Sequence, residues 1–223
     1  MQVKVTLITP TCDRPEGIKL CEMYMARQTY PIHQWIVADG GQTPAALTMG
    51  QEHIHDPMEP GAGNLINNIR NAIELVTGDV VVFIEDDDRV SADHIEVCVN
   101  RLQGYQATGC RWLNYYNIKF RAWRKIRNSC SALCNTAFKA NQLPMLAEAC
   151  DEAERRGIYH VDRLFWNRIK NGNLHDRQTV IGIKGLAGMP GIGIGHKPSP
   201  GWKPDPTGAK LREWVGDDAR YYQ

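Results

Sequence analysis

The feature that most constrains the fold of this chain is an apolar run that ends in four consecutive acids, Val80-Val-Val-Phe-Ile-Glu-Asp-Asp-Asp88. The apolar part, 80–84, is β-branched or aromatic, is too short for a typical helix and follows the turn signal Thr77-Gly78-Asp79. This pattern predicts a buried strand of the kind found in parallel sheets. We therefore expect the acids to lie at the carboxyl end of a central strand.

Four neighbouring carboxylates repel one another unless a cation or a set of strong donors lies among them. In open α/β sheets, ligands bind just beyond the carboxyl ends of the strands, which is where these acids are expected. The alternative is a solvated acidic turn that precedes a helix. We favour a site for a divalent metal and a phosphate group, because the acids end a buried strand.

Strands and helices alternate through the first hundred or so residues. The patterns predict strands at 3–9, 34–38 and 80–84, and helices at 16–28, about 65–76 and 91–102. Ser91 or Asp93 is expected to cap the last of these helices. This order implies right-handed crossovers and a mostly parallel central sheet flanked by helices, which is an α/β fold.

After about residue 104 the alternation loosens. Residues 111–127 mix aromatic and basic side chains, 143–156 and 161–170 have helical patterns, and 182–208 is rich in glycine and proline. Neither a repeat nor a linker divides the sequence, so we expect one domain over 1–223.

Composition limits the classes of protein and the cellular compartments that the sequence is compatible with. The formal net charge of +1 excludes a strongly charged protein, so any basic surface must be local. The seven cysteines are odd in number, scattered and without a C-x-x-C pair, which predicts reduced thiols in a cytoplasmic protein. No apolar run approaches the roughly 20 residues that span a bilayer, so we expect no membrane span.

Five segments carry a family resemblance, and they occur in the family's order. They are Thr9-Pro-Thr-Cys-Asp-Arg-Pro15, Gln28-Thr-Tyr-Pro31, Ile36-Val-Ala-Asp-Gly40, Ile69-Arg-Asn-Ala-Ile-Glu-Leu-Val-Thr-Gly-Asp79 and Phe83-Ile-Glu-Asp-Asp-Asp88. Together they resemble the family 2 glycosyltransferases of the GT-A fold, over residues 3 to about 102.

The resemblance implies a nucleotide-sugar donor, usually a UDP-sugar, across the carboxyl ends of the strands. It also implies Mn²⁺ or Mg²⁺, because hard oxygen ligands suit these ions. The residues that it assigns to the donor are Thr9, Pro10, Thr11, Asp13, Arg14, Asp39, Arg70, Asp86 and Asp87. Arg70 would contact the nucleobase, and the alternative is an arginine on a helix surface. The family often has two aspartates near Asp39, and here Ala38 replaces the first.

The resemblance assigns the metal to Asp86, Asp87 and Asp88, in one of two registers. Counting from the following helix, Glu85-Asp86-Asp87 matches the family's Asp-x-Asp motif, whereas residue identity favours 86–88. Asp87 belongs to both registers and is the central expected ligand. A late histidine often completes such a site, which suggests His196 with His160 as its competitor, although a lone histidine often has no ligand role.

The general base is also implied by the resemblance. The segment His160-Val-Asp-Arg-Leu-Phe-Trp-Asn-Arg168 is similar to the family's Glu-Asp-x-x-Leu-Trp-x-Arg pattern, with Val161 in place of the glutamate. This assigns Asp162 as the catalytic residue that takes the acceptor's proton. The alternative is a helix N-cap, and the two roles are compatible.

The acceptor is the substrate that the sequence constrains least. The mixed segment 111–127 can stack rings and pair with phosphates, which would suit a nucleic-acid base or a phosphate-bearing glycan. Its alternative is a strand pair with a packed aromatic face and solvated bases. We expect residues 1–103 to bind the nucleotide sugar, and residues 104–223 to form the acceptor-binding half and the C-terminal loop.

The expected function is a metal-dependent, inverting glycosyltransferase that acts on a hydroxyl acceptor. One rival is a nucleotidyltransferase that makes nucleotide sugars, but it needs a glycine-rich basic loop after the first strand, which 10–15 is not. A second rival is a non-catalytic nucleic-acid-binding module based on 111–127, which leaves the acidic strand end unexplained.

Overall fold

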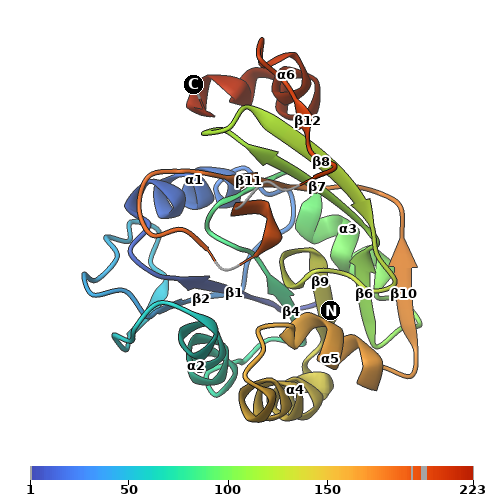
Figure 1. The fold of residues 1–223 in the computed structure, drawn as a ribbon. Helices are drawn as coiled ribbons and strands as arrows, with labels where there is room; N and C mark the ends of the chain where they lie inside the picture. Colours follow the sequence, from blue (N-terminus) through green and yellow to red (C-terminus); the bar gives the residue numbers. More distant parts are fainter. Residues whose placement is uncertain (1, 192, 197–199, 223) are drawn as a thin grey trace.

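The computed structural model describes residues 2–191, 193–196 and 200–222. Within them, seven strands form a main sheet in the order β10-β6-β9-β4-β1-β2-β3 (Figure 1). Their bounds are β1 Val5–Thr11, β2 Gln34–Asp39, β3 Glu52–His55, β4 Val80–Phe83, β6 Ala107–Cys110, β9 Thr136–Lys139 and β10 Gly172–His175. Most neighbours are parallel, and β9 runs antiparallel between β4 and β6.

A second sheet begins where the acidic run ends. Its strand order is β12-β8-β7-β11-β5. The bounds are β5 Asp88–Val90, β7 Trp112–Asn117, β8 Ala122–Arg127, β11 Val180–Lys184 and β12 Lys203–Pro204. Because β4 belongs to the main sheet and β5 to the second, residues 84–87 form the connection between the two sheets.

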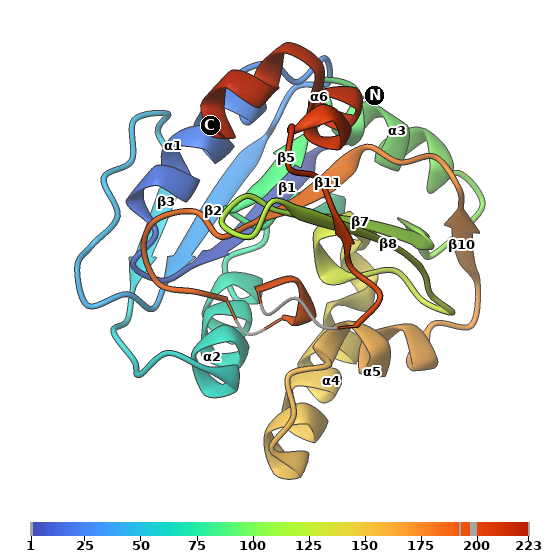
Figure 2. The same cartoon turned by 45° about the horizontal axis from the view of Figure 1, so that its top comes forward.

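Helices cover both faces of the main sheet, as Figures 1 and 2 show. Their bounds are α1 Pro15–Met25, α2 Ala62–Ile73, α3 His94–Arg101, α4 Leu143–Arg156, α5 Val161–Arg168 and α6 Ala209–Val215. Below the sheet in Figure 1 lie α2, α4 and α5, whose apolar side chains pack in one core with Phe83 and Phe138. The other core joins α1, α3 and α6, and Tyr24 of α1 lies 2.5 Å, hydroxyl to hydroxyl, from Tyr222 near the end of the chain.

The central strands are buried because both of their faces carry helices. All seven residues of β1 and all four of β4 are buried, which explains the near-continuous apolar run of 80–84. On α2, Ile66 and Ile69 are at most 2% exposed, and burying each isoleucine contributes about 1.5–3 kcal/mol. The predicted α/β class and the predicted buried strand are confirmed.

Several predicted boundaries are wrong. The first helix ends at Met25 rather than at 28, and α3 begins at His94 rather than at Ser91. The amide of Ser91 donates to Thr179 O, next to the pairing of β5 with β11, so the chain is still extended there. Asp93 occupies the N-cap position of α3, but without a capping side-chain hydrogen bond. Edge strand β3 was not predicted, since its residues are largely exposed. None of the described helices is long and apolar enough to cross a membrane.

Candidate functional site

A cavity of about 280 Å³ opens at the carboxyl ends of β1 and β4. Its walls come from the β1 end, the start of α2, the acidic run, β7, the start of α5 and the segment around His196. Among the lining residues are Pro10, Thr11, Cys12, Arg14, Asn64, Asn68, Glu85, Leu113, Tyr115, Asn128, Tyr159, His160, Asp162, Lys184 and His196. This is the edge of the sheet at which open α/β folds bind ligands.

Arg14 holds the first part of the acidic run. Its Nη1 donates to Asp87 Oδ2 at 2.9 Å, and its Nη2 lies 2.8 Å from Asp86 Oδ1. The second contact is an ion pair without hydrogen-bond alignment, because Asp86 Oδ1 has no hydrogen-bond partner among the described residues. Thr11 completes the environment of Asp86 by donating its hydroxyl to Oδ2 at 2.6 Å. Asp86 is fully buried, so its carboxylate orients Arg14 rather than facing the cavity.

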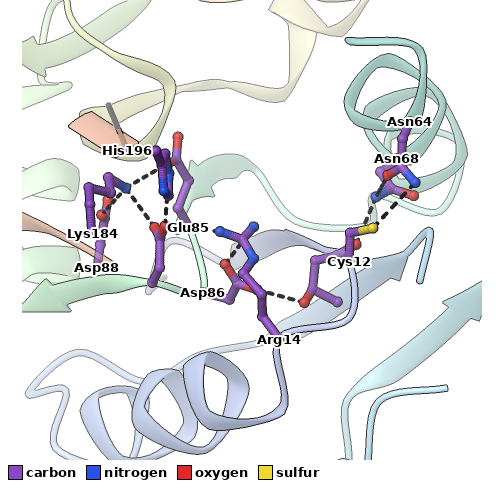
Figure 3. A network of polar contacts seen from close by, with 11 residues as sticks. Cys12, Arg14, Asn64, Asn68, Glu85, Asp86, Asp88, Lys184 and His196 are labelled. Atoms are coloured by element: carbon purple, nitrogen blue, oxygen red, sulfur yellow. Dashed lines mark hydrogen bonds and ion pairs between the residues drawn. The ribbon is translucent and has the colours of Figure 1, made fainter. Parts of the chain in front are cut away.

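Lys184, the last residue of β11, holds the second part of the acidic run. Its ammonium lies 2.6 Å from Asp87 Oδ1, 2.9 Å from Asp88 Oδ1 and 3.4 Å from Glu85 Oε2. His196 Nε2 lies 3.4 Å from Asp87 Oδ2. Figure 3 shows these side chains converging, with Arg14 between them and the asparagines of α2.

The cluster carries more negative than positive charge. Four carboxylates face two cations, Arg14 and Lys184, and burial together with the charge of Lys184 lowers the pKa of His196 to about 4. Burial raises the pKa of Asp86 to about 6 and raises that of Asp88 as well. Burial opposes ionisation of Asp87 too, but Lys184 and Arg14 overcome it and hold the pKa of this carboxyl at about 2.

These residues fit a divalent cation. The charge deficit of the fully ionised cluster equals that of one such ion, and Asp88 Oδ2 is buried without a hydrogen-bond partner within the described chain. Ligand atoms of Glu85, Asp88 and Cys134 lie within 4.8 Å of one another. Glu85 also lines the cavity, and carboxylate oxygens are the ligands that Mg²⁺ and Mn²⁺ favour.

Two asparagines of α2 build the opposite wall of the cavity. Asn68 Nδ2 donates to Thr11 O at 3.0 Å, and Asn64 Nδ2 donates to Gly40 O at 2.8 Å. They tie the loops that follow β1 and β2 to one helix. A Cβ on Gly40 would lie 2.4 Å from the Asn64 amide, so only glycine allows this close approach.

The structure brings only some of the predicted donor residues to the cavity. Pro10, Thr11 and Arg14 line it directly. Thr9, Asp13 and Asp39 lie behind the wall, where they accept hydrogen bonds. Thr9 Oγ1 accepts from Trp35, Asp13 from the amides of residues 42 and 43, and Asp39 from the amides of residues 41 and 45.

Arg70 is not brought to the cavity. Its guanidinium pairs with Asp151 at 2.7 Å and with Glu154 at 2.9 Å, both on the neighbouring helix α4. The residue therefore occupies the helix-surface environment that was the alternative to nucleobase binding. Its donor role stays a prediction without a contact that supports it.

Asp162 lies in the cavity wall, in the first turn of α5. The N-cap position belongs to His160, so Asp162 is not the helix cap, and its Oδ1 accepts from the amide of Arg163 at 2.7 Å. Burial, followed by the nearby charge of Glu85, raises the pKa of this carboxyl. A carboxylate of raised basicity therefore shares one cavity with Glu85 of the acidic run, whereas Asp87 and Asp88 are buried beside that cavity and do not line it.

The mixed segment 111–127 forms the hairpin of β7 and β8. Leu113 and Tyr115 line the cavity, whereas Trp112 lies on the other face of the strand, since neighbours alternate. Lys125 Nζ lies 4.5 Å from the centre of the Trp112 ring, and Arg127 lies 5.9 Å from it. The strand pair of the alternative is confirmed, but Lys125 and Arg127 pack on the Trp112 ring, whereas that alternative expected the bases to be solvated apart from the aromatic rings.

Sequence reasoning missed Lys184 and the two α2 asparagines. Lys184 ends the apolar run Val180-Ile-Gly-Ile-Lys184, and a charged residue that closes a buried strand is a usable signal. Asn64 and Asn68 lie one turn apart on α2, but nothing local distinguishes them from exposed polar positions.

Comparison with known proteins identifies the class. The sequence model described as Glycosyl transferase family 2 matches residues 6–168. This match covers more than half of the chain and includes the acidic run and Asp162. The chain therefore belongs to glycosyl transferase family 2. No curated protein matches the sequence.

The solved structures that resemble this chain have the GT-A fold of glycosyltransferases. TarS of S. aureus superposes with a TM-score of 0.57 at 11% identity, over 81% of this chain and 36% of that one. The mannosyltransferase PcManGT of Pyrobaculum calidifontis, in complex with GDP-Man and Mn²⁺, gives 0.52 at 16% identity, over 81% and 57%. TarS 1–349 in complex with UDP gives 0.51 at 12% identity, over 81% and 60%. The chain thus spans less than two thirds of each of these solved chains.

Proposed function

We propose that this protein transfers a sugar from a nucleotide-sugar donor, a UDP-sugar, to a hydroxyl acceptor with inversion at the anomeric carbon. The observation that carries the proposal is that Asp162 and Glu85 line one cavity at the carboxyl ends of β1 and β4, together with Arg14, Lys184 and His196, which contact the buried carboxylates of Asp86, Asp87 and Asp88. Family membership supports the reaction class. The complexes of PcManGT with GDP-Man and of TarS with UDP support a nucleotide-linked donor.

The divalent ion, Mn²⁺ or Mg²⁺, would be held by Asp87, Asp88 and His196 together with Glu85. When bound, it supplies Lewis-acid neutralisation of the diphosphate leaving group. Asp86 contributes indirectly, because it fixes Arg14, which lines the cavity beside the cluster. Arg14 and Lys184 offer the donor's phosphates two further positive charges.

Asp162 acts as the general base. As the acceptor oxygen attacks the anomeric carbon, its proton passes to the Asp162 carboxylate, and the electron pair of the breaking bond leaves with the nucleotide diphosphate. One displacement inverts the carbon. A base works best when its pKa lies near the working pH, so the raised pKa of Asp162 suits this role.

The two halves of the chain divide the substrates. Residues 1–103 supply most of the donor wall, and residues 104–223 supply Asp162 and the Leu113, Asn128 and Tyr159 side of the cavity, where the acceptor would enter. Of the β8 cations, Arg124 lies opposite Tyr115 and so on the hairpin face that lines the cavity, and its charge would favour an acceptor that carries negative charge, such as a nucleic acid or a phosphate-bearing glycan.

Nucleotide titration tests the proposal. We expect UDP to bind in a calorimeter with Mn²⁺ present, to bind at least tenfold more weakly in EDTA, and to bind weakly to Asp87→Asn. Titrations with GDP and dTDP show whether the protein prefers one nucleobase. The matched control is Asp151→Asn, at an exposed acid outside the cavity. If none of the three nucleotides binds wild-type protein with Mn²⁺, the proposed activity is wrong.

A further inference from the structure

Lys184 is placed unusually for a lysine, because its charged end is buried. Its side chain is 4% exposed, and its ammonium lies within 3.4 Å of three carboxylates, those of Glu85, Asp87 and Asp88. Buried lysines are rare unless paired, so this position is a specific feature of the site rather than a surface ion pair. Lys184 is nevertheless one of the residues that line the cavity.

The stem of Lys184 runs through a slot that two glycines make possible. A Cβ on Gly195 would lie 2.8 Å from Lys184 Cγ and 3.0 Å from Tyr115 Cδ1. A Cβ on Gly182 would lie 2.6 Å from Tyr115 Cδ1 and 3.4 Å from Lys184 Cε. The ammonium also lies 5.9 Å from the centre of the Tyr115 ring. Packing thus confines the stem, so a displacement of the ammonium has to come from rotation about the last bonds of the side chain.

Both oxygens of Asp87 already have partners, since Lys184 pairs with Oδ1 and Arg14 with Oδ2, whereas Asp88 Oδ2 has no hydrogen-bond partner among the described residues. Two of the proposed ligands, Asp87 and Asp88, each give one oxygen to the ammonium, at 2.6 Å and 2.9 Å. A cation bound by both carboxylates would lie close to the ammonium, and like charges at such a distance repel strongly in a buried site. A divalent ion on both carboxylates therefore has to take an Asp87 oxygen from one of its two cations and lies beside the Lys184 ammonium, so metal binding and the Lys184 ion pairs oppose each other.

We propose that Lys184 is a displaceable counter-ion. Its ammonium competes with the divalent ion for Asp87 and Asp88, and metal binding moves it into the cavity, where it pairs with the diphosphate of the donor. The second half of this inference rests on the proposed function, and the first half does not. The expected consequence is that metal and nucleotide each bind more tightly when the other is present.

Binding of Mn²⁺ alone tests the competition. Free Mn²⁺ is followed by electron paramagnetic resonance during titration of wild type, Lys184→Met and Lys170→Met. Methionine keeps much of the stem volume without the charge, and Lys170 is an exposed lysine outside the cavity. We expect Lys184→Met to bind Mn²⁺ at least tenfold more tightly than wild type, and Lys170→Met to match wild type. Equal or weaker binding by a folded Lys184→Met would overturn the proposal.

Wild-type protein provides a measurement that does not depend on the folding of a variant. Lysine acetylation by a small amine-reactive ester is quantified at Lys184 by mass spectrometry, with and without Mn²⁺. Displacement predicts a severalfold faster reaction at Lys184 with Mn²⁺, while Lys170 reacts equally in both. An unchanged or slower reaction at Lys184 would show that the ammonium keeps its carboxylates.

Adding UDP separates this inference from the proposed function. In wild type, we expect UDP to tighten Mn²⁺ binding at least tenfold, and in Lys184→Met we expect this gain to fall to less than threefold. Tight Mn²⁺ binding by Lys184→Met without any UDP binding to wild type would contradict the nucleotide-sugar proposal. It would still support competition between Lys184 and the metal ion. UDP binding with an unchanged gain in Lys184→Met would keep the function and refute the role of the ammonium at the diphosphate.

Discussion

The two sides of the cavity are built in different ways. On the proposed donor side, Arg14, Asp86 and Asp87 follow neighbouring parallel strands; the two carboxylates are buried, the arginine is 15% exposed, and ion pairs join the three. On the proposed acceptor side, the described residues give the Asp162 carboxylate one hydrogen bond, from the amide that follows it in its own helix. The difference indicates that the donor side is held rigid by charge pairs, whereas Asp162 keeps oxygen lone pairs free for a proton.

The largest effect is expected at Asp162. Asparagine keeps the shape of the side chain and removes the base, so we expect Asp162→Asn to lower kcat by about 10²–10⁴ with little change in UDP affinity. The measurement is sugar transfer or donor hydrolysis, and Asp176→Asn, an exposed acid outside the cavity, should match wild type. Near-normal turnover in a folded Asp162→Asn protein would remove the base assignment.

Removing the cation of the donor side should mainly affect stability. Arg14 is 15% exposed and serves two buried carboxylates, so Arg14→Met leaves uncompensated charge and is expected to cost about 3–5 kcal/mol of unfolding free energy. Urea denaturation measures this cost. Arg70→Met is the matched comparison, because its two partners are exposed, and we expect a loss of about 0–1 kcal/mol.

Arg70→Met carries a second test. The predicted nucleobase contact requires UDP affinity to fall, whereas the ion pairs with α4 predict no change. Affinity equal to wild type would assign Arg70 to helix packing, and a tenfold loss would restore the donor role.

His94 joins the two halves of the chain and makes stability depend on pH. Its Nδ1 lies 2.6 Å from Thr179 Oγ1, and burial lowers its pKa from 6.5 to about 4. The unfolded chain gains a proton near pH 6.5 and the folded chain only near pH 4, so this contribution is complete above 6.5 and is lost as pH falls to 4. The full loss is up to about 3 kcal/mol.

Urea denaturation at pH 7 and pH 5 checks this sign. We expect wild type to lose more stability than His94→Gln on acidification, whereas His33→Gln, at an exposed histidine, should follow wild type. An equal pH dependence in His94→Gln would show that other groups dominate this range.

The smallest predicted effect concerns the packing of α2 against the β2 end. Gly40→Ala places a methyl group 2.4 Å from the Asn64 amide and is expected to cost about 1–3 kcal/mol. Gly63→Ala, at a position of α2 with open space, should instead stabilise by about 0.5–1 kcal/mol. Thermal unfolding of both variants gives the comparison, and a neutral Gly40→Ala would show that the asparagine can move aside.

The position of the acids at the end of a central strand could be predicted from sequence, because they are contiguous and follow an unmistakable strand. Their partners could not, since Lys184 reaches Asp88 only through the pairing of β11 with β5, and a five-residue strand does not reveal its neighbour. Arg70 likewise shows that side-chain contacts between distant segments cannot be predicted from local sequence. Its place on α2 was predictable, but its orientation depends on acids of α4, some 80 residues away.

The pairing of β5 with β11 also bears on how the protein is made. Asp88 lies opposite Gly182, so β5, which starts within the acidic run, can pair only after β11 has been synthesised, about 90 residues later. A nascent chain that has reached residue 168, where the family match ends, contains all four carboxylates but not Lys184. Until the ribosome releases β11, these acids lack one of their two cations and stay hydrated. The acidic run therefore gains its second cation only when β11 docks against β5, and burial of the four carboxylates can be completed at that step.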